Sequence, residues 1–218
     1  MKKEIAKILL DKKAVTLNIK EPYTYASGIR SPMYCDNRVL TYFPVERDIV
    51  VQGYVDLIKE NHPDVEIIAG TATGAISWAA WVAEKMNLPM VYIKKSGKGY
   101  GQDNLIEGGS IDDKKTVVIE DTVSTGGSSM NAVQCARKSG GNILSMIAIY
   151  TYEFEKAKNN FEEGNCKALF LTNFSSLVKV AAKNNFIEAD NIELIKEWNK
   201  DPTGWGPKNG FELGEKKN

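Results

Sequence analysis

The sequence predicts an α/β fold whose central sheet is mainly parallel, has five strands and is flanked by helices. Short apolar, β-branched runs alternate with segments of helical periodicity between residues 65 and 171. Right-handed strand–helix–strand units produce this alternation. The chain has 218 residues, 43% of them hydrophobic, which is enough to fill the core of one domain.

The elements follow in chain order. Residues 1–13 carry charges at helical intervals and predict a short amphipathic helix rather than a signal peptide. Pro44 suits the first position of a helix, and apolar residues at helical spacing extend this helix to about Glu60. Later helices are expected at Ala75–Met86 and Ser128–Lys138. The expected strands are Val65–Ala69, Met90–Lys94, Thr116–Ile119, Ile143–Tyr150 and Ala168–Leu171.

Two segments lie outside the alternation of strands and helices, so the predicted domain consists of a core and a hood. Residues 44–171 form the expected core, and residues 1–43 and 172–200 form a small hood over the sheet. We expect hood helices near Leu177–Lys183 and Asn191–Asn199. Residues 1–200 are thus one domain, and the tail 201–218, rich in Gly, Pro and Lys, is expected to be loosely ordered.

The charge balance gives no support to a polyanionic partner. Lys plus Arg and Asp plus Glu both number 28, so we expect no nucleic-acid binding. No stretch approaches the roughly 18 apolar residues of a membrane span. We therefore expect a cytoplasmic protein with no membrane partner.

The cysteines and the histidine exclude several chemistries. Cys35, Cys135 and Cys166 are scattered, odd in number and lack metal-ligand spacing, which argues against a disulfide framework or a zinc site. The single histidine, His62, follows Asn61 in a turn-like sequence and is expected on the surface. Catalysis by a Ser-His or Cys-His pair is therefore set aside.

The most informative motif runs from Val117 to Ser129. An apolar strand leads to adjacent carboxylates, Glu120 and Asp121, and a hydroxyl-rich turn with two glycines precedes a helix. Free amides at a helix N-terminus bind phosphate, and the acid pair suits sugar hydroxyls or a cation. The alternative is a helix start capped by Ser128 or Ser129, which does not require the two acids.

Two further loops follow predicted strands. Gly70–Gly74 could form a second anion cradle or an ordinary turn between a strand and a helix. Lys94–Asp103 carries three lysines separated by glycines. This run is either a solvated charged surface or a movable loop near the active site.

Together these segments resemble a known family. Val117–Ser129 resembles the phosphoribosyl pyrophosphate (PRPP) motif of the type I phosphoribosyltransferases. Tyr23–Arg38 resembles the N-terminal substrate segment of orotate phosphoribosyltransferases, and the similarity covers roughly Met1 to Trp198. The resemblance implies the type I phosphoribosyltransferase fold and transfer of phosphoribosyl from PRPP to orotate with Mg²⁺. It also implies a homodimer in which the Lys94–Gln102 loop reaches the neighbouring active site.

The resemblance assigns roles to individual residues. The implied catalytic residues are Lys94, Lys95, Lys98, Tyr100 and Asp121. The implied PRPP-binding residues are Lys94, Lys95, Lys98, Tyr100, Thr71, Ala72, Thr73, Glu120, Asp121, Thr122, Val123, Ser124, Thr125, Gly126, Gly127 and Ser128. The implied orotate-binding residues are Ala26, Arg30, Tyr34, Cys35, Ser124 and Tyr152. Mg²⁺ is expected to be held mainly by substrate oxygens, with Glu120 or Asp121 as the protein's contribution.

The chain departs from the family pattern at four of these positions. Lys94 and Tyr100 stand where the family commonly has Arg and His, and Ala26 and Tyr152 stand where many members have Lys and Arg. Two alternatives therefore stay open. One is a phosphoribosyltransferase for a purine base, and the other is a non-catalytic regulator that senses PRPP.

Overall fold

The computed structural model describes residues 1–94 and 105–215. Its centre is a six-stranded sheet in the order β10-β9-β8-β5-β6-β7. The strands in that order are β10 (Ala168–Asn173), β9 (Asn142–Thr151), β8 (Lys115–Val123), β5 (Ile67–Thr71), β6 (Met90–Ile93) and β7 (Ile106–Glu107).

The first five strands of that order are mutually parallel, as predicted. The predicted total of five strands was wrong, because β7 pairs with β6 as a sixth, antiparallel strand. Its two residues carry too short a pattern to be recognised in the sequence. Within β8 the buried residues Val117, Val118 and Ile119 form a continuous apolar run, which is typical of a strand covered on both faces.

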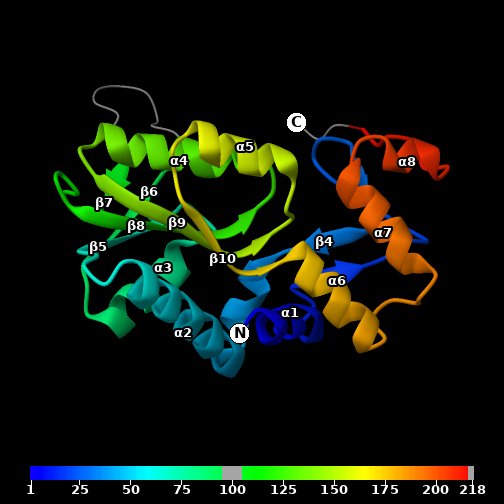
Figure 1. Ribbon diagram of the computed structural model, residues 1–218, viewed down its shortest axis with the longest axis horizontal. Helices are drawn as coiled ribbons and strands as arrows, with labels where there is room; N and C mark the ends of the chain where they lie inside the picture. The colour runs from blue at the N-terminus through cyan, green and yellow to red at the C-terminus, as the bar shows by residue number, and fades with distance from the viewer. Residues whose placement is uncertain (95–104, 216–218) are drawn as a thin grey trace.

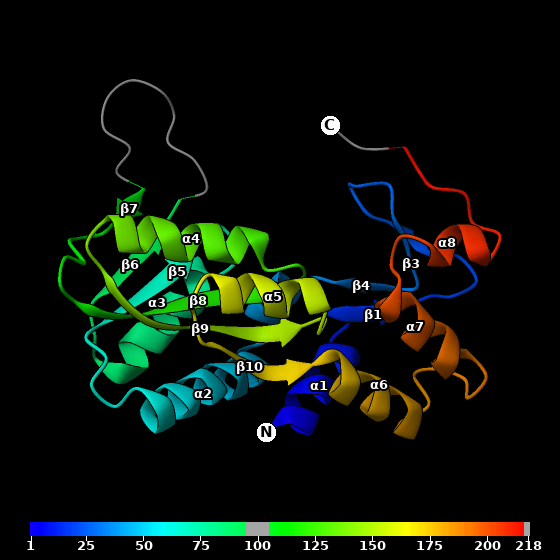
Figure 2. The same ribbon diagram turned by 45° about the horizontal axis from the view of Figure 1, so that its top comes forward.

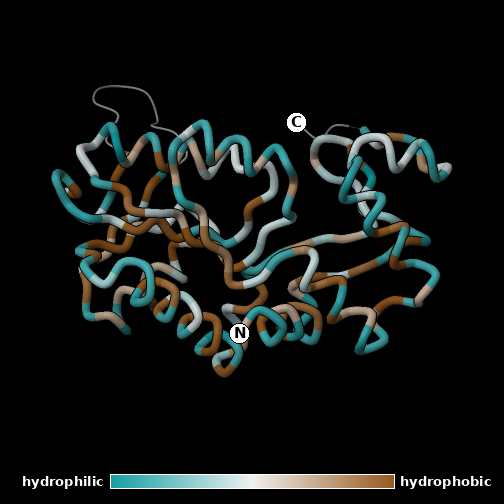
Figure 3. The backbone as a smooth tube through the Cα atoms, in the orientation of Figure 1, coloured by the Kyte–Doolittle hydropathy of each residue, from teal (hydrophilic) through white to brown (hydrophobic). Residues whose placement is uncertain are grey.

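Helices cover both faces of this sheet (Figures 1 and 2). The helices α2 (Pro44–Asn61) and α3 (Ile76–Met86) share one apolar core with α1 (Lys2–Asp11) and α6 (Phe174–Lys183). On the other face, α4 (Gly127–Lys138) and α5 (Glu155–Glu163) enclose a second core. Figure 3 shows the hydrophobic colouring concentrated in the central strands between these two layers.

The N-terminal and C-terminal segments lie together at one end of the molecule (Figure 1). The N-terminal elements are β1 (Val15–Leu17), β2 (Tyr23–Thr24), β3 (Arg30–Ser31), β4 (Met33–Cys35) and the 3₁₀ helix η1 (Asn37–Tyr42). The C-terminal elements are α7 (Asn191–Lys200) and α8 (Trp205–Lys208). The indole of Trp198 donates to the carbonyl of Arg30 at 3.2 Å, which joins the two segments.

Two sequence-based expectations about exposure were wrong. His62 is buried, because its backbone ends α2 and the chain then folds back into the sheet. The tail was expected to be loosely ordered, yet residues 205–208 form α8 and Trp205 is only 2% exposed. The Trp205 ring stacks on Phe211, which provides an apolar anchor that Gly- and Pro-rich composition does not reveal. No helix in the described ranges is long and apolar enough to cross a membrane.

Candidate active site

The acid pair lies where β8 extends beyond its neighbour β5. Pairing between these two strands ends at Gly70 and Ile119, so Glu120 and Asp121 follow the last paired residue. In open α/β sheets the ends of parallel strands are the usual place for ligands. The acid pair therefore stands at the edge where the fold favours a binding site.

A cavity of about 560 Å³ opens at this edge. Its walls come from β8, the β5–α3 loop, the end of β6, the first turns of α4 and the segment after β4. Its lining residues are Cys35, Asp36, Arg38, Thr71, Ala72, Thr73, Gly74, Ile93, Lys94, Glu120, Asp121, Thr122, Ser128, Asn131, Ala132 and Cys135. The structure thus brings together residues from four of the segments that the sequence singled out separately.

The two carboxylates have different surroundings. Burial raises the pKa of Glu120 to about 8, with Asp121 adding to the rise. The Asp121 amide donates to Glu120 Oε1 at 3.0 Å, and the Ser129 hydroxyl lies 3.4 Å from Glu120 Oε2. Asp121 lies against Gly74, where an added Cβ would be 2.6 Å from Asp121 Oδ2. The Glu120 carboxylate is therefore fixed by contacts with the Asp121 amide and the Ser129 hydroxyl, while the Asp121 carboxylate faces Gly74 in the β5–α3 loop.

The backbone of the acid pair is fixed from two directions. The Tyr54 hydroxyl of α2 donates to the Glu120 carbonyl at 2.6 Å. Asn37 Nδ2, from the segment after β4, donates to the Asp121 carbonyl at 2.8 Å. Both donors lie far from the acids in sequence, so this support depends on the tertiary structure.

The glycine turn after β8 has the geometry of an anion-binding loop. Gly126 precedes α4 with a φ of 77°, a conformation that favours glycine. Its position has no capping side chain, so the predicted alternative of a cap from Ser128 or Ser129 is not observed. The first amides of α4 thus remain available to a phosphate.

Helix α5 supports this turn from behind. Asn160 Nδ2 donates to the Thr125 carbonyl at 2.7 Å, and an added Cβ at Gly126 would lie 3.2 Å from Phe161. Residues 155–163 were not predicted to form a helix. Only two of the nine residues of this charged helix, Ala157 and Phe161, are buried, and two apolar positions are too few to indicate a helical period in the sequence.

The structure separates the predicted PRPP contacts into groups. Eight line the cavity, namely Lys94, Thr71, Ala72, Thr73, Glu120, Asp121, Thr122 and Ser128. The other described residues are adjacent: the fully buried Val123 ends β8, Ser124, Thr125 and Gly126 form the turn, and Gly127 begins α4. Lys95, Lys98 and Tyr100 lie outside the described residues.

Most residues assigned to orotate lie away from this cavity. Cys35 lines it, but Ala26, Arg30, Tyr34, Ser124 and Tyr152 do not. The Arg30 guanidinium donates to Thr24 Oγ1 at 2.6 Å and to the Glu212 carbonyl at 2.9 Å. Tyr152 packs among aromatic rings, with its hydroxyl 3.3 Å from that of Tyr25. The orotate assignments therefore stay predictions.

Sequence reasoning missed part of the cavity wall. The lining residues that had no individual assignment are Asp36, Arg38, Ile93, Asn131, Ala132 and Cys135, and Gly74 was included only as part of the Gly70–Gly74 loop. One signal was available, because Ser128, Asn131, Ala132 and Cys135 share one helical face by their spacing of three, four and seven residues. The Asp36 carboxylate and Arg38 form an ion pair that lowers the pKa of Asp36.

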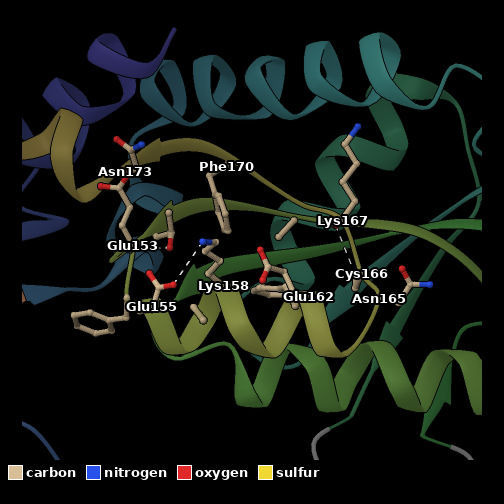
Figure 4. A pocket seen from close by; sticks show the side chains of 14 residues that line it. Glu153, Glu155, Lys158, Glu162, Asn165, Cys166, Lys167, Phe170 and Asn173 are labelled. Carbon is tan, nitrogen blue, oxygen red and sulfur yellow. Dashed lines mark hydrogen bonds and ion pairs between the residues drawn. The ribbon is translucent and has the colours of Figure 1, made fainter. Parts of the chain in front are cut away.

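A second, larger groove of about 770 Å³ lies between α5 and β10 (Figure 4). Phe161, Phe170 and Ala157 contribute apolar surface, and Glu155 and Lys158 form an ion pair 3.5 Å long at its edge. Glu153 accepts a hydrogen bond from the Ser175 amide at 2.7 Å and so supports the start of α6. This groove contains none of the predicted site residues.

Known proteins match this chain over most of its length. No family model matches the chain. An orotate phosphoribosyltransferase of Enterococcus faecalis is 48% identical over 204 residues, which are 94% of this chain and 97% of that protein. An orotate phosphoribosyltransferase of Listeria innocua is 44% identical over 206 residues, 94% of this chain and 99% of the relative. The chain belongs to the orotate phosphoribosyltransferase family.

Solved structures show the same fold at lower identity. Orotate phosphoribosyltransferase from Aeropyrum pernix has a TM-score of 0.70 at 21% identity, over 84% of this chain and 99% of that one. Leishmania donovani UMP synthase has a TM-score of 0.76 at 24% identity. The match covers 90% of this chain and 41% of that longer protein. The predicted type I phosphoribosyltransferase fold is confirmed. An adenine phosphoribosyltransferase also shares it, with a TM-score of 0.62, so the fold alone does not select the base.

Proposed function

We propose that the acid-pair cavity binds PRPP and orotate and transfers the phosphoribosyl group to orotate, giving orotidine 5-monophosphate and pyrophosphate. Membership of the orotate phosphoribosyltransferase family identifies the reaction as a step of pyrimidine synthesis. The observation that carries the site assignment is the placement of Glu120 and Asp121 between a phosphate-type turn and the β5–α3 loop. This arrangement offers separate places for a phosphate, a sugar and a leaving group.

Each wall of the cavity has a chemical part in the proposal. Glu120 and Asp121 bind the ribose hydroxyls, because carboxylates accept hydrogen bonds from them. The turn from Thr122 to Ser128 and the first amides of α4 bind the 5-phosphate. Thr71, Ala72 and Thr73 face the pyrophosphate, and the hydroxyls of Thr71 and Thr73 are the proposed donors, because the Ala72 amide already donates to the Ile93 carbonyl at 2.8 Å.

Charge stabilisation accounts for catalysis in this proposal. Loosening of the bond from C1 to pyrophosphate leaves positive charge on the ribose and negative charge on the leaving group. Lys94 lies 2.6 Å from Glu107 in an exposed ion pair and would exchange this partner for pyrophosphate. Lys95, Lys98 and Tyr100 have the same proposed role. Orotate attacks through a ring nitrogen that reacts as an anion, so positioning and electrostatics replace a dedicated base.

Magnesium is the proposed cofactor. No group of three or more His, Cys, Asp or Glu side chains within residues 1–94 and 105–215 could hold a metal. The two adjacent carboxylates fit Mg²⁺ bound largely through substrate oxygens, because this ion commonly uses one or two protein carboxylates and substrate phosphates. Bound in that way, Mg²⁺ would neutralise charge on the pyrophosphate. Glu120 or Asp121 would hold it.

A homodimer is the proposed assembly. Exposed apolar residues gather next to the cavity wall, where Val39 is 36%, Tyr42 82% and Val45 70% exposed. Such surface on η1 and at the start of α2 suits burial against a second copy. A Tyr42→Ser, Val45→Lys variant should then shift the mass measured by light scattering toward the monomer. Unchanged mass would place the interface elsewhere.

A cytoplasmic location is also proposed. Equal numbers of acidic and basic residues support it. Fractionation of the native host, followed by antibody detection, would test it.

The assay follows the loss of orotate absorbance in the presence of PRPP and Mg²⁺, with adenine, hypoxanthine and uracil in parallel. Consumption of orotate alone supports the proposal, and consumption of a purine would favour the purine-base alternative. PRPP binding without pyrophosphate release from any base would favour the regulator alternative. Omitting Mg²⁺ and adding a chelator tests the cofactor, and retained activity would exclude a requirement for it.

A further inference from the structure

We propose that Asn37 is a positioning residue that makes the Thr122 hydroxyl a hydrogen-bond donor toward PRPP. Asn37 is fully buried at 0% exposure and lies outside the cavity lining. Its Nδ2 atom donates to the Asp121 carbonyl at 2.8 Å and to Thr122 Oγ1 at 2.9 Å. The inference rests on the proposed function of the cavity, since both acceptors belong to cavity-lining residues.

The surroundings of the Asn37 amide permit one orientation. Both contacts of Nδ2 are oxygens that accept, and Cys35 Sγ donates to Oδ1 at 3.7 Å. Burial raises the pKa of the Cys35 thiol to about 12, so the thiol keeps its proton at neutral pH. Rotating the amide by half a turn would place Oδ1 against the Asp121 carbonyl, where two acceptors would face each other.

This orientation determines what the Thr122 hydroxyl can do. A hydroxyl has one proton, and Asn37 already occupies an acceptor position of Thr122 Oγ1. The proton must therefore point to another acceptor. Cys35 Sγ lies 3.8 Å away and is a weak acceptor, whereas an anionic PRPP oxygen in the cavity is a strong one.

Asn37 also connects two walls of the site. It follows β4 and lies beside Cys35, while its amide holds the backbone at the acid pair. A purely structural link would also explain these contacts. Such a link would lower stability on mutation without a selective effect on PRPP, and this difference allows a test.

The experiment is a double-mutant cycle on the full chain with Asn37→Ala, Thr122→Val and the double variant. Each single variant should raise the KM for PRPP roughly tenfold, as expected for a lost hydrogen bond to a charged group. The KM for orotate and kcat should stay close to the wild-type values. The KM for PRPP of the double variant should not exceed that of the more affected single variant, because both changes act on the same hydrogen bond from the Thr122 hydroxyl to PRPP.

Asn61→Ala is the matched control. Asn61 also makes two side-chain hydrogen bonds, to the Leu57 carbonyl at 3.0 Å and to Lys167 Nζ at 2.8 Å. It ends α2, before β5 begins, so it lies at the opposite end of the strand from the site. This variant should lower Tm and leave the KM for PRPP unchanged.

Asn37→Ser covers the case in which Asn37→Ala fails to fold, because a hydroxyl keeps a polar group at this buried position while the Nδ2 donor to Thr122 Oγ1 is removed. Adding Thr122→Val to Asn37→Ser should then cause no further loss of PRPP affinity. The inference is overturned by a wild-type KM for PRPP in the Asn37 variants, or by multiplicative penalties in the cycle. A wild-type protein that makes no orotidine phosphate would instead refute the proposed function.

Discussion

At the residue scale, adjacent acids in one strand have different properties because they face different surroundings. Glu120 is turned toward the chain, where burial raises its pKa to about 8 and Ser129 and the Asp121 amide contact it. Asp121 is packed against Gly74 across the cavity. Sequence adjacency therefore does not imply equal roles, and each acid can be tested separately.

The raised pKa of Glu120 predicts a pH dependence of stability. Between its ordinary value of 4.5 and about 8, the folded protein keeps a proton that the unfolded chain releases. Stability from this group is therefore present at low pH and is lost as the pH rises through that window. In ligand-free thermal melts, the Tm of Glu120→Gln should fall less than the Tm of the wild type as the pH rises from about 5.5 to about 8. A Glu60→Gln variant on the exposed surface should melt like wild type, and equal slopes for Glu120→Gln would contradict the prediction.

Gly74 predicts a steric effect on Asp121. An added methyl group would lie 2.6 Å from Asp121 Oδ2, so Gly74→Ala must displace the carboxylate. We expect PRPP affinity, measured by calorimetry, to fall by roughly tenfold or more, as for loss of a charged hydrogen bond. Gly109→Ala serves as the control, since an added Cβ there meets nothing within 4 Å. Equal affinities for the two variants would show that Asp121 is not a PRPP ligand.

At the scale of elements, the phosphate-type turn depends on a helix that comes later in the chain. Helix α5 contacts the turn through Asn160 at the Thr125 carbonyl and through Phe161 and Ala157 beside Gly126. The crossover that places α5 on this face of the sheet thus supports the turn that follows β8. A change in the turn should therefore affect ligand binding more than a similar change elsewhere.

Gly126→Ala and Gly210→Ala test this dependence as a pair. Both glycines have positive φ, 77° and 80°, so each alanine should cost about 1 kcal/mol of backbone strain. Only Gly126 is closely packed, with Phe161 at 3.2 Å, whereas Gly210 is open. Urea titration should show loss of stability in both variants, and only Gly126→Ala should raise the KM for PRPP. A raised KM in both would indicate a general effect of destabilisation.

At the scale of the whole molecule, the C-terminal segment packs against the segment that resembles a substrate-binding region. Arg30 donates to the Glu212 carbonyl, and the Gly214 amide donates to the Gly28 carbonyl at 3.0 Å. Trp205 is buried and stacks on Phe211 with ring centroids 5.7 Å apart. The C-terminal segment is thus part of the folded unit.

Trp205→Ala should therefore destabilise the protein. Truncation of a buried tryptophan costs about 3 to 5 kcal/mol, which equilibrium urea unfolding measures directly. Leu213→Ala is the control, because that side chain is 59% exposed and its change should be nearly neutral. Wild-type stability of Trp205→Ala would show that the C-terminal segment is not anchored through this ring.

Local sequence patterns were enough to predict the strand–helix alternation, the start of α2 at Pro44 and the motif from Val117 to Ser129. These features arise from local causes, namely apolar periodicity, the fixed φ of proline and the turn preferences of glycine. The five parallel strands were recognisable for the same reason. The acid pair was recognisable because no packing requirement places two carboxylates at the end of an apolar strand.

Contacts between residues far apart in the sequence could not be predicted and depend on the tertiary structure. Asn37 contacts Asp121 and Thr122, 84 and 85 residues away, and α5 reaches back to Thr125. The burial of His62 and Trp205 depends on the chain path and not on local composition. Such contacts involve few residues and leave no period in the sequence. They become visible only when the sheet order brings separate strands and helices to a common edge.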